Sequence, residues 1–237
     1  FLSGPPSLKS SCILILSSIT STPTLNNFMK FSPILSSLSA LLPFAASGAL
    51  VAHYPLDTDA SDASGNGYDG SVVGGSVNFG QAGANGNTGT SAAFPNNGHI
   101  DVPFNSALNP ASYTVTLWAN ASSTNGFASP ITSRDDNPSN VHGFIVYNDN
   151  GGHWNNWTGN AVGVGTWDQL SGGPVSINTW THLALSYDAA TNTKSFYVDG
   201  SLAASKDAGA LYSPNGTVES EDLHIGSGAD GGGGLFF

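Results

Sequence analysis

From Leu50 onward, hydrophobic residues occur in short runs that alternate with polar, turn-forming residues. In YTVTLWANA (113–121), Tyr113, Val115 and Leu117 fall on one face of a β-strand, while the threonines between them fall on the other. No 3.6-residue period accompanies these runs, and clusters of Gly, Asn, Asp, Ser and Pro separate them. The runs are LVAHYPL, GSVVGGSVNF, HIDVPF, YTVTLWANA, GFIVYND, HWNNWTG, THLALSYD, KSFYVDG and DLHIGS. The pattern predicts an all-β sandwich or barrel.

Residues 180–200, WTHLALSYDAATNTKSFYVDG, predict two strands, a polar loop between them and a tight turn at the end. Leu183, Leu185 and Tyr187 share one face of the first strand. The dipeptide Asp199-Gly200 suits a type I′ turn, in which both central residues have positive φ. A third strand then begins near residue 202, so an antiparallel meander is expected.

The residues before Leu50 have a different character. The only methionine, Met29, begins a segment with one lysine, an apolar stretch over 31–44 and small residues up to Ala49. This order is typical of a secretory signal peptide at 29–49, and residues 1–28 are then an upstream segment outside the mature protein. The alternative is an apolar N-terminal strand or a membrane anchor. We therefore expect a secreted protein with one domain over 50–237.

Charge narrows the choice of partners. The chain has 237 residues, of which 9% are charged, and its formal net charge is −11. From residue 50 onward only Arg134, Lys194 and Lys206 oppose all 16 acidic residues, a net charge of −13. Such a surface repels nucleic acids and anionic lipids, and it attracts divalent cations. The only cysteine, Cys12, precedes the predicted domain, so no disulfide is expected there.

Four segments carry a resemblance to a known family: HYPLDTDASDASGNGYDGSVVGG (53–75), SAAFPNNGHIDVP (91–103), YTVTLWANA (113–121) and WTHLALSYD…KSFYVDGSLAAS (180–205), followed by LHIGS (223–227). The chain resembles laminin-G-like (LamG-like) domains, which are related in fold to concanavalin A-like lectins and glucanases. The resemblance implies an antiparallel jelly-roll sandwich. Family members usually end with a strand of the form Gly-x-Ile-Asp-Asp-Val-x-Ile-Tyr, whereas this chain ends in GGGGLFF. A jelly roll lacking its C-terminal closing strand is therefore expected.

The resemblance also implies a candidate calcium site. In family members a calcium ion can lie between the N-terminal loop and the closing strand, and Asp62 and Asn66 are the matching positions here. Hard oxygen ligands on a turn-rich loop suit Ca²⁺ better than Zn²⁺. The alternative is that these residues only form turns. The six histidines show no spacing typical of a metal-binding pair.

Three tryptophans are candidate ligand-binding residues. Trp154, Trp157 and Trp167 lie among Asn, Gly and Asp in GGHWNNWTGNAVGVGTWDQL. Aromatic rings can stack on a sugar while neighbouring amides bind its hydroxyls, but the same rings can also fill the core of a sandwich.

Catalytic chemistry has weaker support. Glycoside hydrolysis needs two carboxyl groups, and the only glutamates, Glu219 and Glu221, lack the spacing of jelly-roll glucanases. We therefore predict a secreted, non-catalytic LamG-like module of a larger protein that binds an extracellular glycan or a cell-surface protein, with no membrane insertion. A jelly-roll glycoside hydrolase and a structural scaffold domain are the alternatives.

Overall fold

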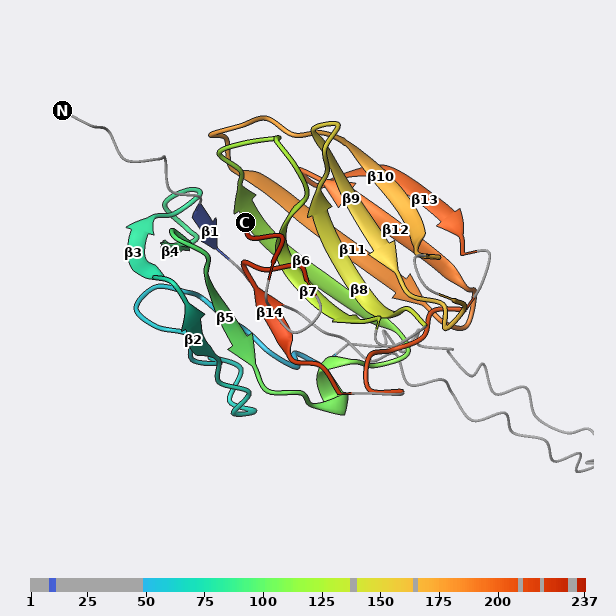
Figure 1. The fold of residues 1–237 in the computed structure, drawn as a ribbon. Helices are drawn as coiled ribbons and strands as arrows, with labels where there is room; N and C mark the ends of the chain where they lie inside the picture. Colours follow the sequence, from blue (N-terminus) through green and yellow to red (C-terminus); the bar gives the residue numbers. More distant parts are fainter. Residues whose placement is uncertain are drawn as a thin grey trace, which may run out of the picture.

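The computed structural model describes residues 9–11, 49–136, 140–163, 166–208, 211–217, 220–229 and 234–237. It contains two seven-stranded antiparallel sheets, shown in Figure 1. The first sheet has the order β13 (Ser201–Asp207), β12 (Thr193–Val198), β11 (Thr181–Asp188), β6 (Tyr113–Asn120), β1 (Lys9–Ser11), β4 (Thr90–Ala93) and β3 (Asn78–Ala82). The second has the order β10 (Asp168–Pro174), β9 (His153–Thr158), β8 (His142–Asn148), β7 (Ala128–Asp135), β14 (Leu223–Ile225), β5 (Gly98–Val102) and β2 (Ser71–Gly74). One short 3₁₀ helix, η1 (Ser106–Leu108), follows β5. The all-β jelly-roll prediction is confirmed.

The hydrophobic core lies between the two sheets and is built from alternate strand residues. In β6 and β11 the inward positions predicted from the sequence are all buried. Leu117 pairs with Leu183 and Val115 with Leu185, so the inward side chains of these neighbouring strands lie side by side. Their shared burial removes apolar surface from water and sets the register, because a slip of one residue would turn both rows outward.

The predicted meander is present as β11, β12 and β13. Asp199 and Gly200 join the last two strands with φ angles of 48° and 76°. The Asp199 carboxylate also accepts a hydrogen bond from the His182 backbone N–H at 2.9 Å. This turn therefore has the conformation that its dipeptide favours.

Several segments differ from the strand pattern read along the sequence. GSVVGGSVNF divides into β2 and β3, which belong to different sheets, because Gly74 turns the chain with a φ of 75°. The LVAHYPL run has alternating burial but no assigned strand. Strands β7 and β10 were not expected, since ASPITSRD and DQLSGGP contain proline or glycine and few large apolar residues.

The N-terminal strand β1 lies within the segment predicted to precede the mature protein. It is placed between β4 and β6 and pairs with both. Residues 12–28 and 29–48, with Cys12 and most of the predicted signal peptide, lie outside the described residues, so processing after Ala49 stays a prediction. Within the described ranges, no helix has the length and apolar character needed to cross a membrane.

The C-terminal segment follows β14. Phe237 is fully buried, and its ring centroid lies 6.3 Å from that of Trp154 in the core. The described residues after β14 form no further strand.

Candidate functional site

The second sheet has an outer face, which we define by the strand residues that alternate with its core-facing ones. Phe144 and Val146 of β8 belong to the main core, whereas Ile145 and Tyr147 belong to a separate cluster with Trp167 and Trp157. Strand pairing carries one row of side chains across this face: Gln169, Trp157, Ile145, Thr132, His224, Asp101 and Ser71. Aromatic residues thus stand at one end of the row and ionisable residues at the other.

At the aromatic end, Phe127, Tyr147 and Trp157 form what we call the aromatic group. Their ring centroids are 5.0 to 5.7 Å apart, and each pair is nearly perpendicular. Tyr147 is buried, Trp157 is half-buried, and Phe127 is 38% exposed. Edge-to-face packing holds these rings in fixed orientations while leaving part of two of them accessible to solvent.

Arg134 borders the aromatic group. Its Nη1 donates hydrogen bonds to Tyr147 Oη and to the Gly228 carbonyl, both at 3.0 Å, and its Nη2 pairs with Asp136. The guanidinium also lies 5.6 Å from the Trp167 ring centroid, within the range of a cation–π contact. Burial raises the pKa of Tyr147 to about 12, and the Arg134 charge offsets this only in part.

The three predicted tryptophans occupy different environments. Trp154 points into the core with no exposed surface. Trp167 is 9% exposed and covered by Arg134, whereas Trp157 lies on the outer face with an accessible ring. The structure brings Trp157 and Trp167 into one cluster and places Trp154 on the other side of the sheet. Phe127 was missed because it stands alone in a polar loop.

The predicted calcium ligands organise their own loop. Asp62 Oδ1 accepts hydrogen bonds from the backbone N–H groups of His53 and Ser64 at 2.9 Å, and Oδ2 accepts from Ser64 Oγ at 2.8 Å and the Tyr68 N–H at 3.1 Å. Partial burial by itself would raise the pKa of Asp62, but these hydrogen bonds outweigh it and hold the pKa below its ordinary value. Asn66 donates from Nδ2 to backbone carbonyls at 2.8 and 3.2 Å. This geometry favours the turn-forming alternative.

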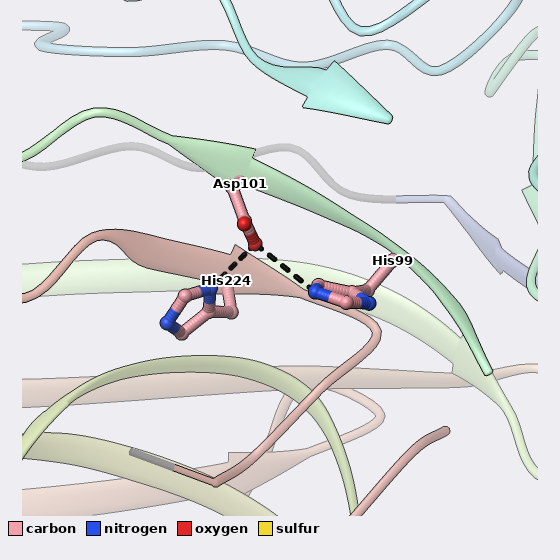
Figure 2. A group of neighbouring side chains, drawn as sticks. All are labelled: His99, Asp101 and His224. Carbon is pink, nitrogen blue, oxygen red and sulfur yellow. Dashed lines mark hydrogen bonds and ion pairs between the residues drawn. The ribbon is translucent and has the colours of Figure 1, made fainter. Parts of the chain in front are cut away.

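At the other end of the row, His99, Asp101 and His224 form a group that the sequence spacing did not indicate. Figure 2 shows both rings directed at the carboxylate of Asp101. Their potential ligand atoms all lie within 4.8 Å of one another, and both histidines are buried. The group was missed because β5 and β14 are distant in the sequence and become neighbours only in the folded sheet.

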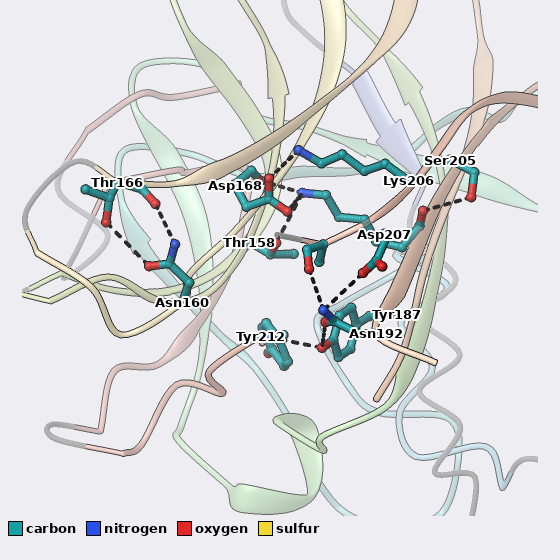
Figure 3. A network of polar contacts seen from close by, with 12 residues as sticks. Thr158, Asn160, Thr166, Asp168, Tyr187, Asn192, Ser205, Lys206, Asp207 and Tyr212 are labelled. Atoms are coloured by element: carbon teal, nitrogen blue, oxygen red, sulfur yellow. Dashed lines mark hydrogen bonds and ion pairs between the residues drawn. The ribbon is translucent and has the colours of Figure 1, made fainter. Parts of the chain in front are cut away.

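A second charged network closes the opposite end of the sandwich. Lys194 of β12 is fully buried, and its Nζ lies 3.0 Å from Asp168 Oδ2 and 3.2 Å from Thr158 Oγ1. Lys206 pairs with the same carboxylate, as Figure 3 shows. Burial lowers the pKa of Lys194 to about 8, although Asp168 acts in the opposite direction. Both lysines thus act in this network, which joins the two sheets.

Family comparison identifies the fold. A laminin G model, described as the concanavalin A-like lectin/glucanases superfamily, matches residues 94–237, more than half of the chain. The chain belongs to this superfamily. No curated protein sequence matches it.

Solved structures with a similar fold are distant from this concanavalin A-like domain. One is the carbohydrate-binding module (CBM40) of a Ruminococcus gnavus IT-sialidase bound to α2,3-sialyllactose, at 17% identity and a TM-score of 0.42, over 50% of this chain and 65% of the other. The chain thus spans about two thirds of that module's length. Another is domain 4 of AbnA, an extracellular arabinanase from Geobacillus stearothermophilus in complex with arabinotriose, at 21% identity and a TM-score of 0.49, over 74% and 82%.

Proposed function

We propose that the protein is an extracellular, non-catalytic glycan-binding module, and that it binds sugars on its aromatic group. The observation that carries the proposal is the partly exposed ring of Trp157 beside the 38% exposed ring of Phe127, on a rigid sheet face. Isolated apolar side chains on a surface are common, but an accessible aromatic ring held in a fixed orientation offers a flat apolar face that can match one face of a pyranose.

Polar groups around the rings suit the hydroxyls of a sugar. Gln169 of β10 is exposed and is the cross-strand partner of Trp157 on β9. Arg134 and Asp136 border the aromatic group on its β7 side. Amide and charged groups beside an apolar platform can fix the orientation of a bound sugar. The excess of negative charge favours neutral or cationic ligands over nucleic acids.

Binding without catalysis fits the described carboxylates near this face. Asp136 is engaged by Arg134, and Asp101 is engaged by two histidines. Of the two glutamates, Glu219 lies outside the described residues, and the Glu221 backbone N–H bonds to Asn215. No described feature favours a hydrolase. In this proposal, secretion depends on the predicted signal peptide at 29–49.

The test is a glycan array with the full chain, followed by titration of each positive glycan. Trp157→Ala and Phe127→Ala should weaken binding about tenfold or more, because a stacking side chain contributes on the order of 1 to 3 kcal/mol. Trp118→Ala is the matched control, since Trp118 is a half-buried tryptophan of the first sheet that contacts His182. If Trp118→Ala weakens glycan binding as much as Trp157→Ala does, or if Trp157→Ala leaves glycan binding unchanged, the aromatic group is not the binding site. A folded protein with no glycan hits would favour the alternative of a cell-surface protein partner.

The calcium hypothesis for Asp62 and Asn66 is tested by thermal unfolding. If Ca²⁺ binds there, CaCl₂ added to the metal-free protein raises the melting temperature of the wild type, and Asp62→Asn lacks this rise. No response of the wild type to CaCl₂ would leave these residues with a turn-forming role alone.

A further inference from the structure

The group His99, Asp101 and His224 has a hydrogen-bonding mismatch that a bound cation would relieve. His99 Nε2 lies 3.3 Å and His224 Nδ1 lies 2.7 Å from the same oxygen, Asp101 Oδ1. His99 Nδ1 lies 3.2 Å from the Asn97 carbonyl oxygen. Both ring nitrogens of His99 thus face acceptors.

A neutral imidazole has only one N–H group and cannot satisfy both contacts. If His99 Nδ1 donates to the Asn97 carbonyl, the lone pair of Nε2 faces the Asp101 carboxylate. A positive charge between Nε2 and the carboxylate removes this repulsion. That charge is either a second proton on His99 or a bound cation.

His224 is 2% exposed, and its Nδ1 is the nitrogen that faces Asp101. Its Nε2 is buried and has no hydrogen-bond partner among the described residues. A metal ion on Nδ1 would leave the proton on Nε2 and would not give this atom a partner, so the case for the ion rests on the atoms that face Asp101.

We propose that His99 Nε2, Asp101 and His224 Nδ1 bind a divalent transition-metal ion, with Zn²⁺ as the best fit. Two imidazoles and one carboxylate are ligands typical of Zn²⁺ sites, whereas Ca²⁺ prefers oxygen ligands alone. Tetrahedral coordination with bonds of about 2.1 Å separates ligand atoms by roughly 3.4 Å. The His99–Asp101 distance of 3.3 Å already matches, and the His224–Asp101 distance of 2.7 Å needs a small opening.

The surroundings fit such a site. With metal on Nε2, His99 donates its Nδ1–H to the Asn97 carbonyl, the usual arrangement that fixes a metal-binding histidine. The row neighbours on the flanking strands, Ser71 and Thr132, are uncharged, so no described cation in that row competes for Asp101. The Asp101 side chain is 21% exposed, which leaves a path for an ion and for a fourth ligand from solvent.

The bound metal would join β5 to β14. The Phe236 ring lies 5.6 Å from that of His99, so the C-terminal segment packs on the same group. A metal that binds only the folded chain raises its stability in proportion to metal concentration. Loss of metal would loosen the part of the sheet that β14 completes.

The experiment titrates the full chain with ZnCl₂ by calorimetry and follows thermal unfolding, with CaCl₂ in parallel. We expect one equivalent of Zn²⁺ and a rise in melting temperature that variants of the three ligands lack. His99→Gln, Asp101→Asn and His224→Gln should each weaken Zn²⁺ binding by roughly 100-fold. His153→Gln is the control, since the His153 side chain is 49% exposed and lies on β9.

A measurement on the wild type covers the case in which these variants fail to fold. The imidazole ¹⁵N resonances of two histidines should shift on addition of one equivalent of Zn²⁺, and CaCl₂ should leave them unchanged. The proposal is overturned if the folded wild type does not bind Zn²⁺, if only His153→Gln reduces binding, or if His99 proves doubly protonated and stays so in excess Zn²⁺.

Discussion

Trp154 and Trp157 show how position within one strand separates structure from function. They are three residues apart, so their side chains leave β9 on opposite faces, one into the core and one onto the outer face. The same residue type therefore has two roles within a single six-residue strand. Trp154 has no exposed surface, so folding removes more of its apolar area from water than it does for the partly exposed Trp157.

Replacing Trp154 by alanine should lower the free energy of unfolding by about 3 to 5 kcal/mol, because it leaves a large cavity beside Phe237. Trp157→Ala should lower it by clearly less, since that ring is already partly solvated. Urea denaturation of both variants measures the difference. Equal losses would show that Trp157 is as much a core residue as Trp154.

Lys194 predicts a pH dependence of stability. Its pKa in the folded chain is about 8, below the ordinary value of 10.5, so between these values the unfolded chain binds more protons and stability rises with pH. Lys194→Met should remove a rise on the order of 1 to 2 kcal/mol between pH 8 and pH 10. Above pH 10 the raised pKa of Tyr147 acts in the opposite direction.

Denaturant unfolding at several pH values compares this variant with Lys206→Met, whose side chain is 37% exposed and whose pH dependence should resemble the wild type. If the free energy of unfolding of Lys194→Met rises between pH 8 and pH 10 as steeply as that of the wild type, burial of Lys194 is not the cause of the pH dependence.

At the scale of elements, β1 contributes backbone pairing to the first sheet. Among the residues whose burial is described, the buried members of the main hydrophobic cluster come from Ala52 onward. β1 instead occupies the edges of β4 and β6, which pair with it and not with each other. Unpaired strand edges favour association with other chains.

A chain that starts at Leu50 should therefore still unfold cooperatively but should self-associate more than the full chain. Sedimentation velocity over a range of concentrations tests this, and circular dichroism reports folding. A shortened chain that is unfolded, or as monomeric as the full chain, would contradict the expectation. The predicted signal peptide makes this comparison relevant to the mature protein.

At the scale of the whole molecule, the net charge of −11 is unfavourable for the compact state through self-repulsion. Raising NaCl from about 0.02 to 0.5 M should increase the melting temperature by roughly 2 to 5 °C, because added ions screen exposed charges. The salt effect should shrink near the isoelectric point of about 4.4, where the repulsion disappears. A melting temperature independent of salt at pH 7 would show that the charges are too dispersed to matter.

Much of the fold follows from local sequence. Alternating residues such as Val115 and Leu117 settle which face of a strand is buried, because side chains along a strand alternate in direction whatever the neighbouring strand is. Asp199-Gly200 likewise settles its turn, since few dipeptides tolerate two positive φ angles. The order of these elements was enough to predict a jelly-roll sandwich by family resemblance.

Only the tertiary structure decided which distant residues meet. β2 and β3 come from one continuous run but join different sheets, and β7 and β10 depend on their neighbours more than on their own composition. His99 and His224 approach one carboxylate because β5 pairs with β14. Strand pairing is non-local and sequence patterns are local. The sequence by itself therefore determined the faces and turns of this protein, whereas the pairing of strands decided its candidate sites.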